Sequence, residues 1–280
     1  MKLKTGIVLC GVALMVHGTS WSGELHVDFR HQGFDNTALR LVGPDAEQLV
    51  SPTERGLLMW IPANEGIAGP VGVAARKLLH GDFEIVAEYE LLRYDRPRDG
   101  SWVGVGLVVE FPTVAADAIT LARLAIPTEG DRFVSADLPF GDGRAISDSR
   151  RAPAWSRTGK LLLVRAGTTV RAYYAEGGEA FKLLREREVG HGDARLARLG
   201  PEAGAGRHRV EVLLSSLTVT ADEFAEPPES PAPSTSGIDP VLLGVGALDI
   251  LLIAFAAWRL WPKHRGSPSR KTPRASGWKD

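Results

Sequence analysis

Hydrophobic and polar residues alternate along much of the middle of the chain. The segment Asp82–Leu92 (DFEIVAEYELL) is the clearest case, because its two sides differ sharply in polarity. One side consists of Phe83, Ile85, Ala87, Tyr89 and Leu91, and the other consists of Glu84, Val86, Glu88 and Glu90. A period of two with carboxylates on one side predicts an antiparallel strand that has one buried and one solvated face.

Similar segments recur between turns that are rich in Gly, Asp or Asn. Lys160–Ala175 predicts two strands joined by a turn at Ala166–Thr168. The other predicted strands are Ala38–Val42, Leu57–Ile61, Ser101–Phe111, Ile119–Ile126, Phe133–Leu138, Phe181–Glu188 and Arg209–Ala221. About ten short strands without a long amphipathic helix predict an all-β fold, an antiparallel two-sheet jelly-roll sandwich.

The N-terminal residues 1–23 depart from this pattern and are typical of a secretory signal peptide. Lys2 and Lys4 precede the apolar run Thr5–Val16, and small polar residues suited to cleavage follow. The alternative is an uncleaved anchor, although a membrane span needs about 20 apolar residues. Cleavage would remove Cys10, the only cysteine, so the sequence favours no disulfide scaffold and no Cys-based metal site.

The C-terminal part of the sequence predicts a membrane anchor. Pro240–Trp261 is apolar apart from Asp249 and Arg259, and it is long enough for a hydrocarbon core of about 30 Å. The tail 262–280 is basic, which places it in the cytoplasm by the positive-inside rule. We therefore expect a type I single-pass protein of the cytoplasmic membrane, with residues 24–224 exported and the Pro/Ser-rich residues 225–239 as a linker.

Asp249 is a costly residue inside the predicted transmembrane helix, since a carboxylate there is unfavourable by a few kcal/mol. Gly246, Asp249 and Ile253 share one helical face, which makes them candidates for contact with a partner helix or a second copy of the chain. The alternative is a single helix in which Asp249 is protonated.

Charge is distributed unevenly between these segments. The whole chain has a formal net charge of −1, but residues 24–223 contain 24 Lys and Arg against 29 Asp and Glu. Neither value has the cationic excess of a nucleic-acid-binding protein, so we expect no nucleic-acid partner.

Four segments of the exported region resemble a known superfamily. In chain order they are His80–Tyr89 (HGDFEIVAEY), Val103–Leu107 (VGVGL), Leu162–Tyr174 (LLVRAGTTVRAYY) and Glu179–Leu184 (EAFKLL). Their order is similar to that in concanavalin A-like, laminin-G-like jelly rolls of lectins and glucanases, and is closest to a planctomycete-type, membrane-anchored bacterial family. The resemblance implies a two-sheet sandwich over most of Gly56–Asp222 and no catalytic assignment.

The glucanase branch of that superfamily sets a test for catalysis. A retaining enzyme needs two carboxylates about 5 Å apart, usually arranged on one strand as Glu, an apolar residue, Asp and a later Glu. Glu84, Glu88 and Glu90 share a face, but Val86 stands where the pattern requires Asp. The chain also contains neither G-x-S-x-G nor H-E-x-x-H, so we assign no catalytic residue.

Two sets of residues are candidates for binding. Asp137, Asp142 and Asp148 lie in one Gly-containing loop that could offer oxygens to Ca²⁺, but the favoured interpretation is an ordinary turn without any cofactor. Aromatic side chains near strand ends could contact a ligand, and they are Trp102, Trp155, Tyr94 and Phe140. Trp155 lies in the basic segment Arg150–Arg157, for which the favoured interpretation is a solvated loop with the ring packed onto the sheet, and the alternative is a recognition loop.

Three functions are compatible with the sequence. The favoured one is a membrane-anchored binding module for carbohydrate or a cell-envelope polymer, which rests on fold analogy. The second is a glycan-active hydrolase with an unrecognised carboxylate pair. The third is an accessory subunit that docks onto a membrane complex through Asp249.

Overall fold

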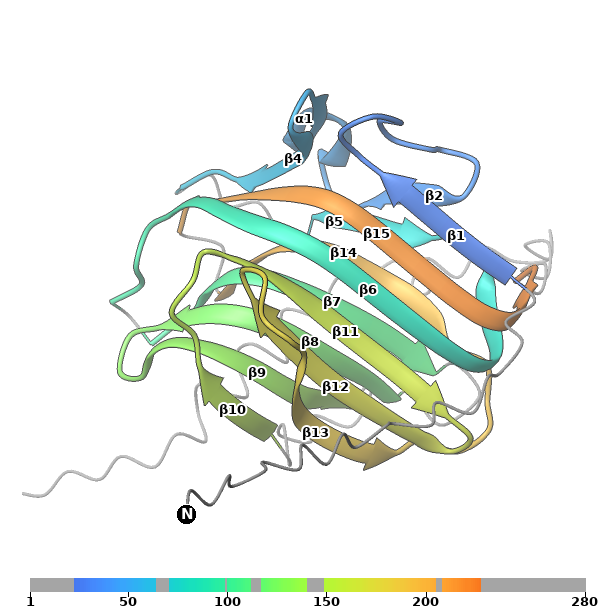
Figure 1. Cartoon of the computed structure of the whole chain (residues 1–280). Helices are drawn as coiled ribbons and strands as arrows, with labels where there is room; N and C mark the ends of the chain where they lie inside the picture. The colour runs from blue at the N-terminus through green and yellow to red at the C-terminus, as the bar shows by residue number, and fades with distance from the viewer. Residues whose placement is uncertain are drawn as a thin grey trace, which may run out of the picture.

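Strands pair into two antiparallel sheets that pack face to face in the computed structural model (Figure 1). The structure describes residues 23–63, 71–98, 100–111, 117–139, 149–204 and 208–227. Within them one short helix, α1 (Ala46–Leu49), accompanies the strands. The predicted all-β, two-sheet architecture is therefore confirmed.

The sheet nearer the viewer in Figure 1, here the front sheet, has eight strands. In spatial order they are β13 (Lys182–Glu188), β12 (Thr169–Glu176), β11 (Thr158–Ala166), β6 (Leu78–Tyr94), β15 (Val210–Ala225), β4 (Gly56–Ile61) and β3 (Val50–Thr53), with β1 (Gly23–Asp28) also paired to β15. The back sheet has seven strands. They are β10 (Ser149–Pro153), β9 (Gly130–Pro139), β8 (Asp117–Ile126), β7 (Val103–Phe111), β14 (Arg195–Ala203), β5 (Gly72–Ala75) and β2 (Leu39–Val42).

The alternation first seen in the sequence decides how β6 sits in the front sheet. Its predicted apolar side is buried against the back sheet, at Phe83, Ile85, Ala87, Tyr89 and Leu91. Its glutamates are only partly buried and face outward. The β11–β12 hairpin is also confirmed, with Gly167 at its turn in a left-handed conformation (φ 60°).

The sequence pattern missed five strands, namely β1, β3, β5, β10 and β14. Three of them are short, and β14 carries a bulge between Leu196 and Arg198 that breaks the period of two. β1 begins at Gly23, at the expected end of the signal peptide, and pairs along β15. β10 occupies Ser149–Pro153, where the basic residues had indicated a loop.

Among the described residues no helix is long and apolar enough to cross a membrane. The predicted helix at 240–261, with Gly246, Asp249 and Ile253, lies outside those residues. Residues 1–22 of the predicted signal peptide and 228–239 of the predicted linker also lie outside them.

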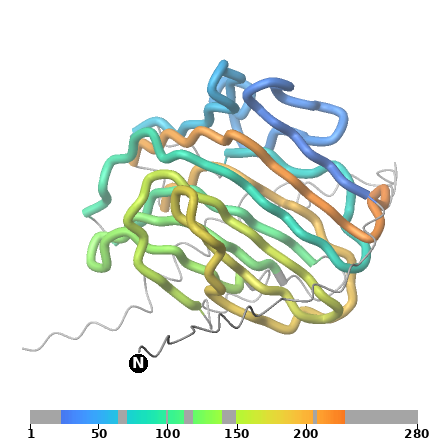
Figure 2. The backbone as a smooth tube through the Cα atoms, in the orientation of Figure 1, coloured from blue at the N-terminus to red at the C-terminus, as the bar shows by residue number. Residues whose placement is uncertain are grey.

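Both ends of the described chain lie at the same end of the sandwich (Figure 2), which we call the proximal end. There Gly23 pairs with Ala221, and Leu78 of β6 pairs with Ala225. β6 then runs for 17 residues, about 55 Å at 3.3 Å per residue, to Tyr94. We call the end at Tyr94 the distal end.

Gly56 tests the packing of the front sheet. It has a φ of 139°, and a Cβ at this position would lie 2.2 Å from the backbone oxygen of Leu214. We expect Gly56→Ala to lower the free energy of unfolding by about 1–3 kcal/mol in chemical denaturation. Gly178→Ala, where an added Cβ meets open space, is the matched control and should change it by less than about 0.5 kcal/mol. If both substitutions lowered the free energy of unfolding equally, the close contact of Gly56 with the backbone of Leu214 would be contradicted.

Candidate functional site

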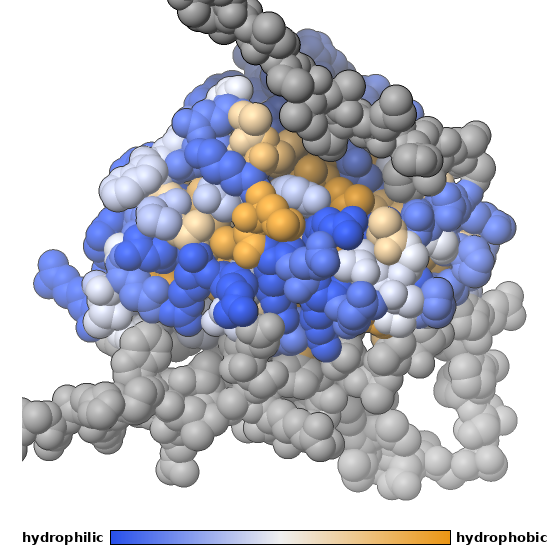
Figure 3. Space-filling view, turned by 60° about the horizontal axis from the view of Figure 1, so that its bottom comes forward, coloured by the Kyte–Doolittle hydropathy of each residue, from blue (hydrophilic) through white to orange (hydrophobic). Residues whose placement is uncertain are grey.

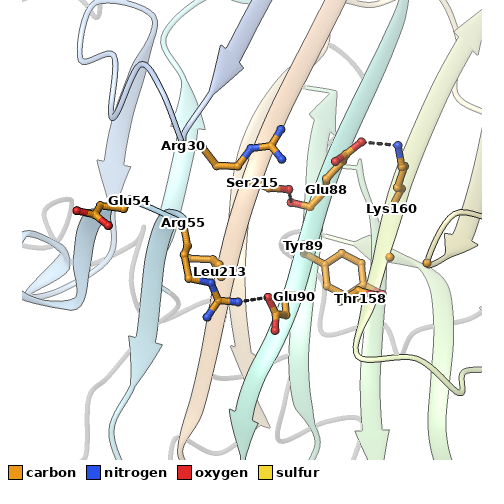
Figure 4. Close-up of a pocket in the computed structure, with 12 residues that line it drawn as sticks. Arg30, Glu54, Arg55, Glu88, Tyr89, Glu90, Thr158, Lys160, Leu213 and Ser215 are labelled. Carbon is orange, nitrogen blue, oxygen red and sulfur yellow. Dashed lines mark hydrogen bonds and ion pairs between the residues drawn. The ribbon is translucent and has the colours of Figure 1, made fainter.

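An open groove of about 420 Å³ lies on the outer face of the front sheet (Figure 4). Its floor consists of residues of β6, β11 and β15, and its rim comes from turns at Arg30, Glu54, Arg55 and Gly177. The lining contains many polar side chains because outward-facing positions of the strands carry Glu88, Glu90, Thr158, Lys160 and Ser215. A polar groove of this kind can exchange hydrogen bonds with a ligand rich in hydroxyl groups.

Two carboxylates of β6 face this groove, and each is paired with a cation. Glu88 forms an ion pair with Lys160 of β11, and Glu90 accepts a hydrogen bond of 2.7 Å from Arg55 (Figure 4). The two glutamates are two residues apart on one strand, so their Cα atoms are separated by about 7 Å. The cations neutralise both carboxylates in place.

Glu84 lies on the same face of β6 but differs from these two glutamates. Its cross-strand neighbours are Val164 and Thr220, and no ion pair joins it to any cation among the described residues. Burial raises the pKa of its carboxyl group above the usual value. It is four residues from Glu88, about 13 Å along the strand.

The segment between β10 and β11 presents Trp155 to solvent. Its side chain is 83% exposed, so the favoured interpretation, a ring packed onto the sheet, is wrong. The backbone beneath it is held, because the amides of Trp155 and Ser156 donate to the carboxylate of Glu176 at 2.6 and 2.7 Å. The ring is therefore an exposed aromatic surface on a fixed backbone.

Further contacts anchor the same segment to both sheets. Ala154 is buried and its amide donates to the carbonyl of Asp131 at 3.0 Å. The carbonyl of Ser156 accepts from Nη2 of Arg123 at 3.2 Å. The carbonyl of Arg157 accepts from the amide of Leu91 at 2.8 Å, which ties the segment to β6.

The groove and the Trp155 segment meet at Thr158. Thr158 lines the groove, and its hydroxyl lies 3.1 Å from that of Ser156. Gly177 also lines the groove and follows Glu176, which holds the amide of Trp155. We define the distal site as this groove together with Trp155, Ser156 and Arg157.

Tyr94 supports the distal site from within the sandwich. It is half-buried, and its hydroxyl donates to Asp131 at 3.0 Å. The guanidinium carbons of Arg123 and Arg157 lie 5.7 and 5.4 Å from its ring centroid, within the range of cation–π attraction. Arg123 is almost fully buried and forms an ion pair of 2.8 Å with the same Asp131.

The structure does not bring the other predicted ligand residues to this site. Trp102 is half-buried and packs against Ala122, Leu124 and Val134, a cluster separate from the main core. It is therefore not an exposed platform like Trp155. Phe140 lies outside the described residues.

Asp137, the one predicted calcium ligand that is described, already has two cationic partners. Its Oδ1 lies 2.6 Å from Nη1 of Arg185 and 2.7 Å from Nη1 of Arg187. Two guanidinium groups on one carboxylate oppose a metal cation there. Asp142 and Asp148 lie outside the described residues. The described residues contain no group of three His, Cys, Asp or Glu side chains suited to binding a metal ion.

A second surface is apolar rather than polar. Figure 3 turns the lower side of Figure 1 forward and shows hydrophobic side chains gathered within a hydrophilic surround. In the described residues the exposed large hydrophobic side chains, besides Trp155, are Phe181 and Leu183 beside or within β13. The distal site differs because it combines an exposed ring with many hydrogen-bonding groups.

Sequence reasoning singled out Trp155 but missed Glu176, Arg157 and the groove. Glu176 lies 21 residues from Trp155, so only the fold reveals that it holds the segment. The combination of basic residues and an aromatic residue in Arg150–Arg157 was the one signal in the sequence that could have pointed to Arg157 as a site residue.

Comparisons with known proteins agree with the fold. The family model described as "Protein of unknown function (DUF1583) C domain" matches residues 12–239. No curated protein matches the sequence. A similar solved chain, from work titled "Prominent members of the human gut microbiota express endo-acting O-glycanases to initiate mucin breakdown", has 10% identity and a TM-score of 0.52, over 70% of this chain and 98% of that one.

Two other solved structures are similar to a lower degree. The GH43 protein BlXynB from Bacillus licheniformis has 17% identity and a TM-score of 0.48 over 70% of this chain, which spans only 39% of that protein. The exoplasmic/lumenal domain of VIP36, in a Ca²⁺/Man3GlcNAc-bound form, has 9% identity and a TM-score of 0.44, over 72% of this chain and 89% of that one.

Glu84 provides a pH test of the outward face of β6. Because its pKa is raised in the folded state, folding favours the protonated form, and stability is lost as pH rises through the folded pKa. We expect Glu84→Gln to raise the Tm at pH 7 and to leave it nearly unchanged at pH 3.5, below the unfolded pKa of about 4.3. Thermal unfolding at both pH values measures this difference.

The control for this test is Glu24→Gln, because Glu24 is exposed on β1. It should not change the Tm at either pH. An equal gain for Glu84→Gln at both pH values would show that the effect comes from packing rather than from ionisation.

Proposed function

The chain belongs to the DUF1583 C-domain family, and from this premise we propose that it is a membrane-anchored module that binds a carbohydrate or a cell-envelope polymer outside the cytoplasmic membrane. The observation that carries the proposal is Trp155, which is 83% exposed on an anchored segment beside a polar groove. An exposed indole ring offers a large, flat apolar surface for contact with another molecule, and its N–H adds a hydrogen-bond donor.

The distal site has two properties that suit a glycan. Sugars offer apolar C–H faces that stack on an aromatic ring, and hydroxyl groups that bond to side chains such as those of Thr158, Ser215 and Glu88. The backbone of Trp155 is already fixed by Glu176, so little backbone conformational entropy is lost when a ligand binds.

A similar solved structure supports the two-sheet fold of the domain, but it does not identify the ligand. One similar chain comes from work whose title names endo-acting O-glycanases. At 10% identity that likeness extends to the two-sheet sandwich alone. The proposal therefore rests on the distal site itself.

Hydrolysis is the weaker alternative for the same groove. A retaining glycosidase needs a carboxylate and a carboxylic acid about 5 Å apart. Glu88 and Glu90 are each paired with a cation, whereas the carboxyl with the raised pKa, Glu84, is about 13 Å from Glu88 along β6. The groove therefore favours binding over bond cleavage.

The proposed anchor would orient the distal site away from the lipid. The linker 225–239 follows β15 at the proximal end, and β6 spans about 55 Å from there to Tyr94. With the helix 240–261 in the membrane and the basic tail in the cytoplasm, Trp155 would stand at the outer end of the domain. We also retain Gly246, Asp249 and Ile253 as the proposed contact with a partner helix or a second copy.

Trp155→Ala tests the binding role. In a glycan array with the full chain, we expect binding to at least one glycan and about a tenfold loss of affinity for Trp155→Ala, the size of a stacking contact of 1–1.5 kcal/mol. Leu183→Ala, which removes an exposed apolar side chain elsewhere, should leave affinity unchanged. Binding that Trp155→Ala does not weaken would exclude this site, and no glycan binding at high density would refute the carbohydrate role.

Membrane association is tested separately. We expect the full chain to remain in the membrane fraction after an alkaline carbonate wash, whereas a chain that stops after residue 239 should be released. Asp249→Leu should stay in the membrane, and a reduced complex size in native electrophoresis would support the partner contact. Release of the full chain by carbonate would contradict the proposed anchor.

A further inference from the structure

We propose that the distal site selects acidic glycans, with Trp155 stacking on a sugar ring and Arg157 binding an acid group carried by the polymer. This inference rests on the proposed function and narrows its ligand class. It is argued from the charges around Trp155, which differ from those of the domain as a whole.

Arg157 is an exposed cation two residues after Trp155. Its carbonyl is fixed by the amide of Leu91, and its guanidinium group lies over the ring of Tyr94 at 5.4 Å. Its side chain has one hydrogen bond, a long one of 3.4 Å to the carbonyl of Leu92. Among the described residues no carboxylate forms an ion pair with it, so its charge is available to a ligand.

The carboxylates near Trp155 are already engaged. Asp131 accepts from Arg96 at 3.0 Å, from Arg123 at 2.8 Å and from the hydroxyl of Tyr94. Glu176 accepts the two backbone amides at 155 and 156. Neither carboxylate forms an ion pair with Arg157, and around Asp131 two guanidinium groups outnumber the one carboxylate.

The same imbalance extends to the turn between β8 and β9. There Glu129 forms ion pairs with both Arg151 and Arg132, the latter at 4.0 Å. Residues 24–223 as a whole contain more Asp and Glu than Lys and Arg, 29 against 24. A cationic corner on an acidic domain attracts anions locally, because exposed charges beyond about 8–10 Å are screened by salt.

Guanidinium chemistry determines the ligand class. Its planar set of donors binds two oxygens of a carboxylate, sulfate or phosphate at once, which an uncharged hydroxyl cannot match. Stacking on Tyr94 limits the conformations of Arg157 before binding. An aromatic ring and a free guanidinium two residues apart therefore fit a sugar that carries an oxyanion.

Matched polymers test this inference with the purified full chain. The probes are polygalacturonate against its fully methyl-esterified form, and dextran sulfate against dextran, which separate a carboxylate from a sulfate source. We expect at least tenfold tighter binding of one acidic polymer than of its neutral partner, with a preference that falls as salt rises. Arg157→Gln should remove most of that preference, and Arg157→Lys should retain part of it.

Lys77→Gln is the matched control, since it removes one exposed charge near the proximal end. It should keep the full preference, and thermal unfolding checks that each variant is folded. Equal binding of the acidic and neutral partners would overturn this inference while leaving the proposed function standing. A preference that survives Arg157→Gln would overturn the role of Arg157, and failure to bind any of the four polymers or any arrayed glycan would overturn the proposed function.

Discussion

The pairing of β6 with β15 is the interaction on which the rest of this structure depends. The two strands remain paired from Tyr94 and Val210 at the distal end to Leu78 and Ala225 at the proximal end. The other strands of the front sheet lie on either side of this pair. On the side away from β6, β15 pairs first with β4 and then, farther along the strand, with β1. Three bulges in the register allow such long strands to follow the twist of the sheet.

The distal site is a product of this arrangement. Glu88 and Glu90 face the groove because β6 alternates strictly, with Tyr89 buried between them. At the end of β6, Tyr94 meets Asp131 of the back sheet and so closes the distal end. The buried charge of Arg123 is acceptable there only because Asp131 neutralises it.

Sequence pattern predicted the front sheet better than the back sheet, for a physical reason. A front strand such as β6 has one wet face and one dry face, so its composition alternates. The outer face of the back sheet is also largely covered, and β7 is buried at nearly every position. Position 106 is a glycine because a Cβ there would lie 2.3 Å from the carboxylate of Glu202. A residue far along the chain therefore determines which side chain fits at position 106, and the local sequence does not show it.

The candidate site, like the strands, was predictable from the sequence only in part. Trp155 was visible as an aromatic in a basic segment, but its exposure depends on Glu176 at the end of β12 and on Asp131 near the start of β9. The interpretation of Asp137 as a calcium ligand could not include Arg185 and Arg187, which reach it from a strand about 50 residues later. Such long-range partners leave no periodic signal in the sequence.

The direction of β15 has a mechanical consequence. A ligand bound at the distal end and a tether at Ala225 would pull along the strand rather than across it. The hydrogen bonds of an antiparallel pair lie perpendicular to the strands, so this force would load many of them together in shear. A domain held in that way resists peeling open strand by strand, and tension along the polymer would reach the anchor through the most extensively bonded strand of the fold.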